Sequence, residues 1–391
     1  MAATGLSSPS YWTRRRVVAV AIQGVVLAAV AALLSLAAVN VSGNLERLGA
    51  ASGFGFLWHR AGFAIEQHLI PYSEDSTYFR AFVVAVLNTL VLAVVALVIA
   101  TVIGFCVGLG RRSSNGLVHG VATAYVETLR NIPLLLQLFF WYFAMLRPLP
   151  APRQSISLFG IAFLSNRGLV LPAPVAEPGF GSVLLALGIG VLLALIVTRS
   201  LAQRRARTGS APKAWPLALA LVLGLPLLTA IATAFPLHWE IPHLQGFNFQ
   251  GGMTVLPEFV AMALALSLYS ASYVAEIVRA GLDAVPRGQI EAARALGLKS
   301  GTISAKITIP QALRVIVPPL GNEYLRLLRN TTLAAAIAYS DLTQVFGGTV
   351  LNQTAQALEV MAMVAGTYLV INAAVSALLN WYNRRVAWVQ R

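Results

Sequence analysis

Long apolar windows constrain this chain more than any other feature of its sequence. Stretches of roughly 20 mainly apolar residues, the length that spans a bilayer as a helix, recur at Val17–Val39, Phe82–Gly110, Leu117–Leu146, Phe180–Thr198, Trp215–Phe235, Pro257–Val278 and Leu358–Tyr382. Hydrophobic residues make up 58% of the chain and charged residues only 11%, whereas soluble domains carry about 25% charged residues. Backbone groups in lipid must bond within their own segment. The sequence therefore predicts an all-α polytopic membrane protein.

The basic residues predict the orientation of these helices. With an eighth, more polar span at about 315–339, 19 of the Lys and Arg residues fall on one side of the membrane and 6 on the other. Because cytoplasmic loops carry the excess of Lys and Arg, both termini and the loop at 283–316 are expected in the cytosol. Two cytosolic termini require an even number of spans, which gives about eight transmembrane helices.

The first apolar window could be mistaken for a signal peptide. It follows Arg14, Arg15 and Arg16 and runs from Val17 to Val39. A signal core has about 7–15 apolar residues, so this window is too long. We expect an anchor helix that stays in the protein.

The loop at 283–316 is rich in helix-start and helix-stop signals. Pro286 can open a helix and Gly297 can close it in the left-handed conformation. Ser300 can cap a second short helix, which Pro310 is expected to stop. Two short helices joined at a glycine on the basic side of the membrane predict a docking element.

This loop resembles a known family signature. Glu291, Ala292 and Ala293 are followed after three residues by Gly297, and after nine more by Ile307-Thr308-Ile309-Pro310. The pattern is similar to the EAA motif of permease subunits in ATP-binding-cassette (ABC) importers, with Ile309 in place of the usual Leu. The resemblance implies that the loop docks on a cytosolic ATPase. The residues it assigns to ATPase coupling are Glu291, Ala292, Ala293, Gly297, Ile307 and Pro310.

The resemblance covers most of the chain and implies a type I ABC importer permease core. That core corresponds to the second, third, sixth, seventh and eighth spans. The remaining parts are an N-terminal anchor span with a periplasmic segment at 1–81, and a helical hairpin within an insertion at 147–256 of the transmembrane domain, 82–385. The outer segments 40–77 and 147–179 resemble those of general L-amino-acid permeases. The first is predicted to be a hairpin or short helix on the outer leaflet, and the second a turn-rich, extended path.

The more polar span predicted at about 315–339 carries its polar residues on one face. At 100° per residue, Asn322, Glu323, Arg326, Arg329 and Asn330 fall within an arc of about 120°. Charge within a bilayer costs about 2.5–3.5 kcal/mol per residue, so this face must meet protein or water. Glu323, which resembles a substrate-contacting glutamate of amino-acid importers, could accept the ammonium of an amino acid, and Arg326 or Arg329 could bind its carboxylate. The alternative is a structural ion pair between Glu323 and Arg326. Pro318 and Pro319 are expected to break the helix just before this face.

Two other spans add candidates. Tyr269, Ser270 and Tyr273 lie near the middle of the sixth span, where the family often has an Asn-Ser-Gly-Ala-Tyr sequence, so they join Glu323, Arg326, Arg329 and Asn330 as predicted substrate-pathway residues. Glu276 and Arg279 favour a structural pair at i,i+3. In the third span, Pro133 is expected to kink the helix and Gln137 is a weaker pore-lining candidate.

The sequence lacks the signatures of other function classes. It contains no P-loop, no H-E-x-x-H and no G-x-S-x-G sequence, its one cysteine is Cys106, and its five histidines lack ligand spacing. We therefore expect no catalytic residues, no metal site and no cofactor of its own, with ATP bound by a partner. The net charge of +14 is explained by the orientation rule, so nucleic acid is not an expected partner.

Together these features predict a permease subunit, not an enzyme, of an ABC importer for L-amino acids in the bacterial inner membrane. The expected partners are the bilayer, a cytosolic ABC ATPase dimer, a second and different permease, and a periplasmic amino-acid-binding protein. An ion-coupled secondary amino-acid transporter is the alternative, although the sequence shows no pair of matching halves. A membrane-embedded enzyme is a weaker alternative.

Overall fold

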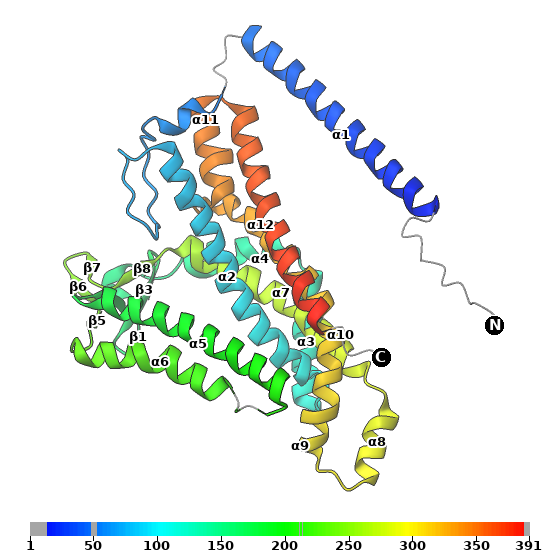
Figure 1. The fold of residues 1–391 in the computed structure, drawn as a ribbon. Helices are drawn as coiled ribbons and strands as arrows, with labels where there is room; N and C mark the ends of the chain where they lie inside the picture. The colour runs from blue at the N-terminus through cyan, green and yellow to red at the C-terminus, as the bar shows by residue number, and fades with distance from the viewer. Residues whose placement is uncertain (1–13, 48–52, 211, 213, 387–391) are drawn as a thin grey trace. The chain divides into compact units, whose positions relative to one another are not determined.

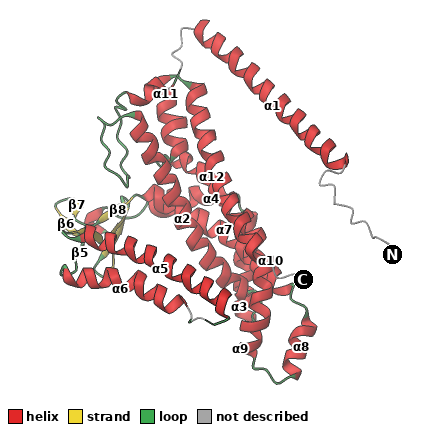
Figure 2. Cartoon of the chain, in the orientation of Figure 1, coloured by secondary structure: helices red, strands yellow, loops and turns green. Residues whose placement is uncertain are grey.

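The computed structural model describes residues 14–47, 53–210, 212 and 214–386, and these residues are mainly helical (Figures 1 and 2). The α-helices are α1 (Arg14–Arg47), α2 (Tyr78–Gly110), α3 (Gly116–Asn131), α4 (Leu134–Phe139), α5 (Phe180–Thr208), α6 (Ala214–Ala232), α7 (Pro257–Asp283), α8 (Arg287–Ala295), α9 (Ser300–Ile303), α10 (Ile309–Asn330), α11 (Leu351–Thr354) and α12 (Ala357–Val386). Turns of 3₁₀ helix occur at Phe54–Trp58, Pro152–Gln154 and Thr331–Ile337, and π-helical segments at Phe140–Leu146, Ser304–Thr308 and Thr343–Val350.

Five helices of the described chain are long and apolar enough to cross a membrane, namely α2, α5, α6, α7 and α12. A sixth crossing results if α3 and the segment Leu134–Leu146 form one span, but the two are bent by 104°. The polytopic helical fold is therefore confirmed, whereas the count of eight spans stays a prediction. Helix α1 covers the first predicted span and contains a shorter apolar stretch, Ala21–Leu33.

Helix α10 differs from the more polar span predicted at about 315–339. It runs from Ile309 to Asn330, so it begins and ends earlier than 315–339. Pro310 lies in its first turn, where a proline is tolerated, and therefore starts this helix instead of stopping the one before it. Pro318 and Pro319 lie inside α10 without ending it, so the expected break is also wrong. Ser300 is the first residue of α9, not its cap, which is Lys299.

The inserted hairpin is longer than its apolar windows. Helix α5 continues to Thr208, where Gly209 closes it with a left-handed φ of 71°. The basic stretch from 202 to 208 is therefore helical. Helices α5 and α6 lie side by side (Figure 1), and a Cβ built on Gly190 would lie 2.5 Å from the Leu221 carbonyl oxygen. That close approach holds the hairpin together.

Short antiparallel strands, which the sequence analysis did not predict, occupy the segments on either side of the hairpin. One sheet has the order β1-β2-β3-β8, and β4 pairs with β5 and β6 with β7. The strands are β1 (Ile156–Leu158), β2 (Ala162–Ser165), β3 (Gly168–Leu171), β4 (Ala173–Ala176), β5 (Leu237–Glu240), β6 (His243–Gln245), β7 (Asn248–Gln250) and β8 (Met253–Val255). Their three or four residues give too short an alternation for sequence patterns to reveal.

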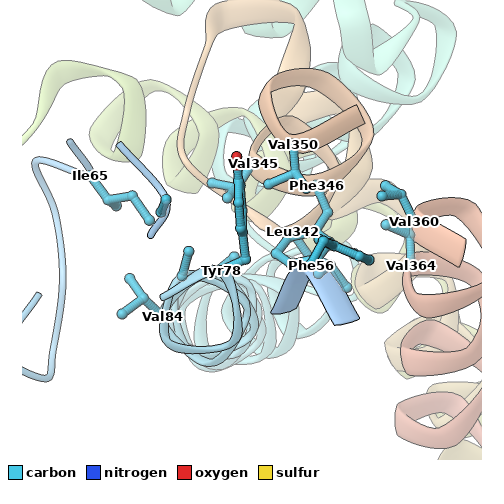
Figure 3. Packing of buried hydrophobic residues seen from close by; sticks show 13 residues of the cluster. Phe56, Ile65, Tyr78, Val84, Leu342, Val345, Phe346, Val350, Val360 and Val364 are labelled. Atoms are coloured by element: carbon cyan, nitrogen blue, oxygen red, sulfur yellow. The ribbon is translucent and has the colours of Figure 1, made fainter. Parts of the chain in front are cut away.

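The described chain divides into two compact units, one within residues 1–90 and 340–382 and the other within 91–339 and 383–391. The first unit has its own apolar core, in which Phe56, Ala61 and Ile65 pack with Tyr78, Val84, Leu342, Val345, Phe346, Val350, Val360 and Val364 (Figure 3). Within the segment 40–77, for which a hairpin or short helix was expected, residues up to Arg47 belong to α1 and Phe54–Trp58 form a 3₁₀ turn whose Phe56 side chain is buried in this core. Its placement on the outer leaflet stays a prediction.

Candidate functional site

Helices α7 and α10 of the second unit pack through their apolar faces. Val274, Val278 and Leu282 of α7 are buried against Ala312, Ile316 and Leu320 of α10. At Gly281 a Cβ would collide with the Ile316 side chain. Because this face of α10 is used for packing, its polar face is directed elsewhere.

Glycines also bring α2 against α7. A Cβ on Gly104 would lie 2.5 Å from Cβ of Val274 and 2.9 Å from the Ala271 carbonyl oxygen, and a Cβ on Gly108 would lie 2.8 Å from the Ala275 carbonyl oxygen. Small residues let helix backbones approach closely in membranes. These contacts fix α7, which carries the aromatic part of the site.

A cavity of about 410 Å³ opens along the polar face of α10. Its lining residues in the described chain are Arg130, Tyr273, Glu276, Ile277, Pro319, Asn322, Glu323, Arg326 and Arg329. All of them belong to the second unit. Its volume falls in the range of small-molecule sites.

Glu323 is the most deeply buried charge in this cavity. Its side chain is 4% exposed and forms an ion pair with Arg326, one turn further along α10. The predicted structural pair is therefore present. The Glu323 Oε1 atom and the neighbouring Ser270 hydroxyl are both buried without a hydrogen bond of normal geometry to any described residue. Glu323 thus keeps unused acceptor capacity beside the cavity.

Tyr273 presents its ring to two arginines. The Arg326 guanidinium carbon lies 3.7 Å from the ring centroid and that of Arg130 lies 5.0 Å from it. The Tyr273 hydroxyl is 3.1 Å from the hydroxyl of Tyr269. Cation–π contacts of this kind strengthen when water is excluded, so the ring helps to position both arginines.

An ion network lies at the end of α7 that leads into the loop. Glu276 pairs with Arg111 of α2 and, at 2.5 Å, with Arg279. Arg279 also pairs with Asp283 at 2.8 Å, and Asp283 with Arg112 at 3.0 Å. The predicted pairing of Glu276 with Arg279 is confirmed, and it forms part of a network that ties α2 to α7.

The structure brings most of the predicted pathway residues together. The cavity lining includes Glu323, Arg326, Arg329 and Tyr273. Outside the lining, Tyr269 contacts Tyr273 and Ser270 contacts Glu323. Asn330 is not part of the described lining. Whether these residues meet a substrate stays a prediction.

The sequence placed Asn322 on the polar face that lines the cavity, but it did not predict Arg130 and Glu276 as lining residues. Arg130 comes from α3, and no pattern in the sequence shows that α3 ends against α7. Gln137, the weaker pore candidate, does not line this cavity. Its side-chain amide donates to the carbonyl oxygens of Leu129 and Ile132, at 2.8 and 3.0 Å, so it satisfies the backbone where the chain bends before Pro133.

The loop at 283–316 forms the predicted pair of short helices. Helix α8 follows Pro286 and ends before Gly297, whose φ is 72°. Ala293 is buried, whereas Glu291, Ala292 and Gly297 are exposed and Leu296 is 80% exposed. Ile307 is half-buried in the π-helical segment, and Pro310 is exposed at the start of α10.

Comparison with known proteins gives a family match over most of the chain. The family model described as "Binding-protein-dependent transport system inner membrane component" matches residues 100–388. The match includes the cavity and the loop.

Three curated relatives cover nearly the whole chain. The permease protein YhdX of Escherichia coli (strain K12) is 50% identical over 90% of each chain. The "General L-amino acid transport system permease protein AapQ" of Rhizobium johnstonii is 47% identical over 90% of this chain and 88% of the relative. The "Glutamate/glutamine/aspartate/asparagine transport system permease protein BztB" of Rhodobacter capsulatus is 40% identical over 99% of this chain and 97% of the relative.

Proposed function

Because this chain belongs to the family of binding-protein-dependent transport system inner membrane components, we propose that it carries L-amino acids across the inner membrane. Import is driven by ATP that a separate ATPase hydrolyses. The observation that carries the proposal is the charged cavity between α7 and α10, because ionisable groups inside a membrane mark substrate paths. The names of the relatives AapQ and BztB support amino acids as the substrate.

The chemistry of the cavity suits a zwitterion. An amino acid needs an acceptor for its ammonium and donors for its carboxylate. Glu323 provides the acceptor, and Arg326 or Arg329 provides donors in the fork geometry that carboxylates match. Glu323 and Arg326 pair with each other before substrate enters. An entering zwitterion replaces this ion pair with two, one at its ammonium and one at its carboxylate. Tyr269, Ser270, Tyr273 and Asn330 complete the proposed pathway.

Coupling to ATP hydrolysis is assigned to the loop. In this proposal α8 docks into the ATPase through Glu291, Ala292 and the neighbouring Leu296, while Gly297 sets the direction of the chain after the helix. The half-buried Ile307 and Pro310 connect the docking helix to α10. Because α10 carries Glu323, movement of the loop reaches the cavity through one helix.

The proposed assembly contains more than this chain. Asn322 and Arg329 are exposed in the cavity, so a second, similar permease is proposed to cover that face. A periplasmic binding protein delivers the amino acid, and an ABC ATPase dimer binds ATP, so this chain needs no cofactor and performs no catalysis. Both termini are placed in the cytosol by the distribution of basic residues.

A thiol cross-link tests the coupling role. In a Cys106→Ala background, Leu296→Cys places a thiol at a highly exposed position of the loop, and Ser114→Cys places a matched exposed thiol between α2 and α3. With the neighbouring genes co-expressed, we expect Leu296→Cys alone to give an ATP-sensitive adduct with the ATPase. Equal adducts at both positions, or none, would contradict the assignment.

Gly297→Asp tests the same role by transport. A side chain at a left-handed φ costs about 1 kcal/mol, and nothing lies within 4 Å of the position that a β-carbon would take, so the helix end shifts without a clash. We expect the protein to insert normally but to lose ATP-driven uptake. Uptake driven instead by an ion gradient and insensitive to vanadate would favour the secondary transporter.

A further inference from the structure

We infer that the cavity on α10 prefers amino acids with an anionic side chain, and that Arg329 and Arg130 bind the second carboxylate. This inference rests on the proposed function, in which the same cavity passes amino acids. It adds the substrate class and two specificity-determining residues.

The charges that line the cavity do not balance. Three arginines and two glutamates line it within the described chain. Arginine remains protonated in proteins, so all three contribute a full positive charge.

Both glutamates are already engaged. Glu323 pairs with Arg326 inside the cavity. Glu276 pairs with Arg111 and Arg279, which lie outside the lining. The negative charge of Glu276 is therefore shared among arginines before a ligand enters, which leaves little of it for the cavity.

Two lining arginines remain available. Arg329 is exposed in the cavity and forms no ion pair within 4.0 Å with an acidic side chain of the described residues. Arg130 lies over the Tyr273 ring and near Glu276, without an ion pair at that distance in the same part of the chain. A ring face attracts a guanidinium but does not neutralise it.

The excess of positive charge makes the affinity depend on the charge of the substrate side chain. A neutral amino acid uses its ammonium and its single carboxylate on Glu323 and Arg326. Glutamate or aspartate brings a second carboxylate, which a guanidinium can bind through two parallel hydrogen bonds. Lysine or arginine instead brings a second cation toward Arg329 and Arg130, where repulsion is stronger than in water because the surroundings are less polar. The expected order of affinity is glutamate, then glutamine, then lysine.

The test measures binding without the binding protein, which has its own selectivity. The complex of this chain with its partner permease and ATPase is purified in lipid nanodiscs, and binding of labelled L-glutamate, L-glutamine and L-lysine is measured without ATP. We expect glutamate to bind at least about tenfold more tightly than lysine, because one charge-assisted hydrogen bond is worth about tenfold or more in affinity.

Variants of Arg329 identify the residue responsible. Arg329→Gln should lower glutamate affinity about tenfold and raise lysine affinity because one repelling charge is removed, Arg329→Lys should retain the preference, and Arg329→Glu should reverse it. Arg314→Gln is the matched control, because Arg314 lies on the same helix outside the cavity lining. A loss of folding in Arg329→Gln would be seen as loss of binding of all three amino acids, and Arg329→Lys then decides.

The outcomes separate this inference from the proposed function. Equal binding of lysine and glutamate, an Arg329→Gln variant with an unchanged ratio, or no binding of any amino acid overturns the inference. If the same complex still imports amino acids when ATP and binding protein are added, the proposed function stands without it. If ATP drives no uptake of any amino acid, the proposed function fails and the inference falls with it.

Discussion

Two pairs of helices in the second unit are built on opposite principles. The buried share of the most apolar window is 61% in α7, but only 17% in α5 and 0% in α6. The α5–α6 hairpin packs on itself, as Figure 1 shows, and α6 has no charged residue. The α7–α10 pair instead buries its apolar faces and holds Glu323, Arg326 and Arg329 along the cavity.

The difference shows where a membrane protein can keep charge. A charged side chain is costly in lipid but can be held where packed helices exclude lipid from it. The glycines at 104, 108 and 281 provide that packing at the site, whereas Gly190 brings α5 against α6 and most of the remaining hairpin surface is exposed and apolar. The site should therefore depend on the packing of α7, and the exposed surface of the hairpin should tolerate change.

Overpacking the contact between α2 and α7 should give the largest effect. Gly104→Leu forces a side chain into Val274 and the Ala271 carbonyl oxygen, so we expect a loss of about 3 kcal/mol of stability and failure of the complex to assemble. Gly188→Leu on α5 meets nothing within 4 Å of its Cβ and should cost less than about 0.5 kcal/mol. Thermal unfolding of the purified complexes measures both, and equal losses would remove the contrast.

Neutralising the buried carboxylate should rank second. Glu323→Gln removes the buried charge that pairs with Arg326, whose own side chain is 35% exposed, and weakens the acceptor for the substrate ammonium. We expect ATP-driven uptake to fall at least tenfold. Glu127→Gln makes the same change where the side chain is 61% exposed and should leave uptake within about twofold. Normal uptake by Glu323→Gln would make Glu323 a structural residue.

Removing the ring between the arginines should have a moderate effect. Tyr273→Leu deletes the face on which Arg326 and Arg130 lie, and a cation–π contact contributes about 0.5–2 kcal/mol. We expect the apparent affinity for substrate in uptake assays to fall about threefold to tenfold. Trp215→Leu on α6, which is 66% exposed, should leave it unchanged. An equal change in both variants would point to a general loss of stability.

Trimming the hairpin surface should have the smallest effect. Leu228 on α6 is 65% exposed, and Leu228→Ala removes apolar area that faces lipid rather than protein. Uptake should match that of the wild type, and the free energy of unfolding should stay within about 0.5 kcal/mol of the wild-type value. A clear loss of uptake at normal stability would show that the hairpin contacts a partner subunit.

The sequence predicts those parts of the molecule that depend on local patterns. Hydropathy finds α2, α5, α6, α7 and α12, and the cap signals at Pro286 and Gly297 find α8. Helical projection also groups Glu323, Arg326 and Arg329 on one face, as the cavity confirms.

The parts that the sequence does not predict depend on contacts between distant segments. Prolines 318 and 319 are accommodated inside α10, which packs on α7 through Ile316 and Leu320. Arg130 reaches the cavity because α3 packs on α7, where its guanidinium lies over the Tyr273 ring. The strands pair residues from both ends of the insertion, such as Leu169 with Val255.

The most direct test of the account is whether an amino acid protects the cavity from a thiol reagent. In a Cys106→Ala background, Asn322→Cys places a thiol in the lining, and Leu185→Cys places one on the exposed surface of α5. We expect a saturating transported amino acid to slow labelling of the Asn322→Cys complex severalfold and to leave the Leu185→Cys complex unchanged. Labelling of Asn322→Cys at the same rate with and without the amino acid would contradict the assignment of this cavity as the substrate path.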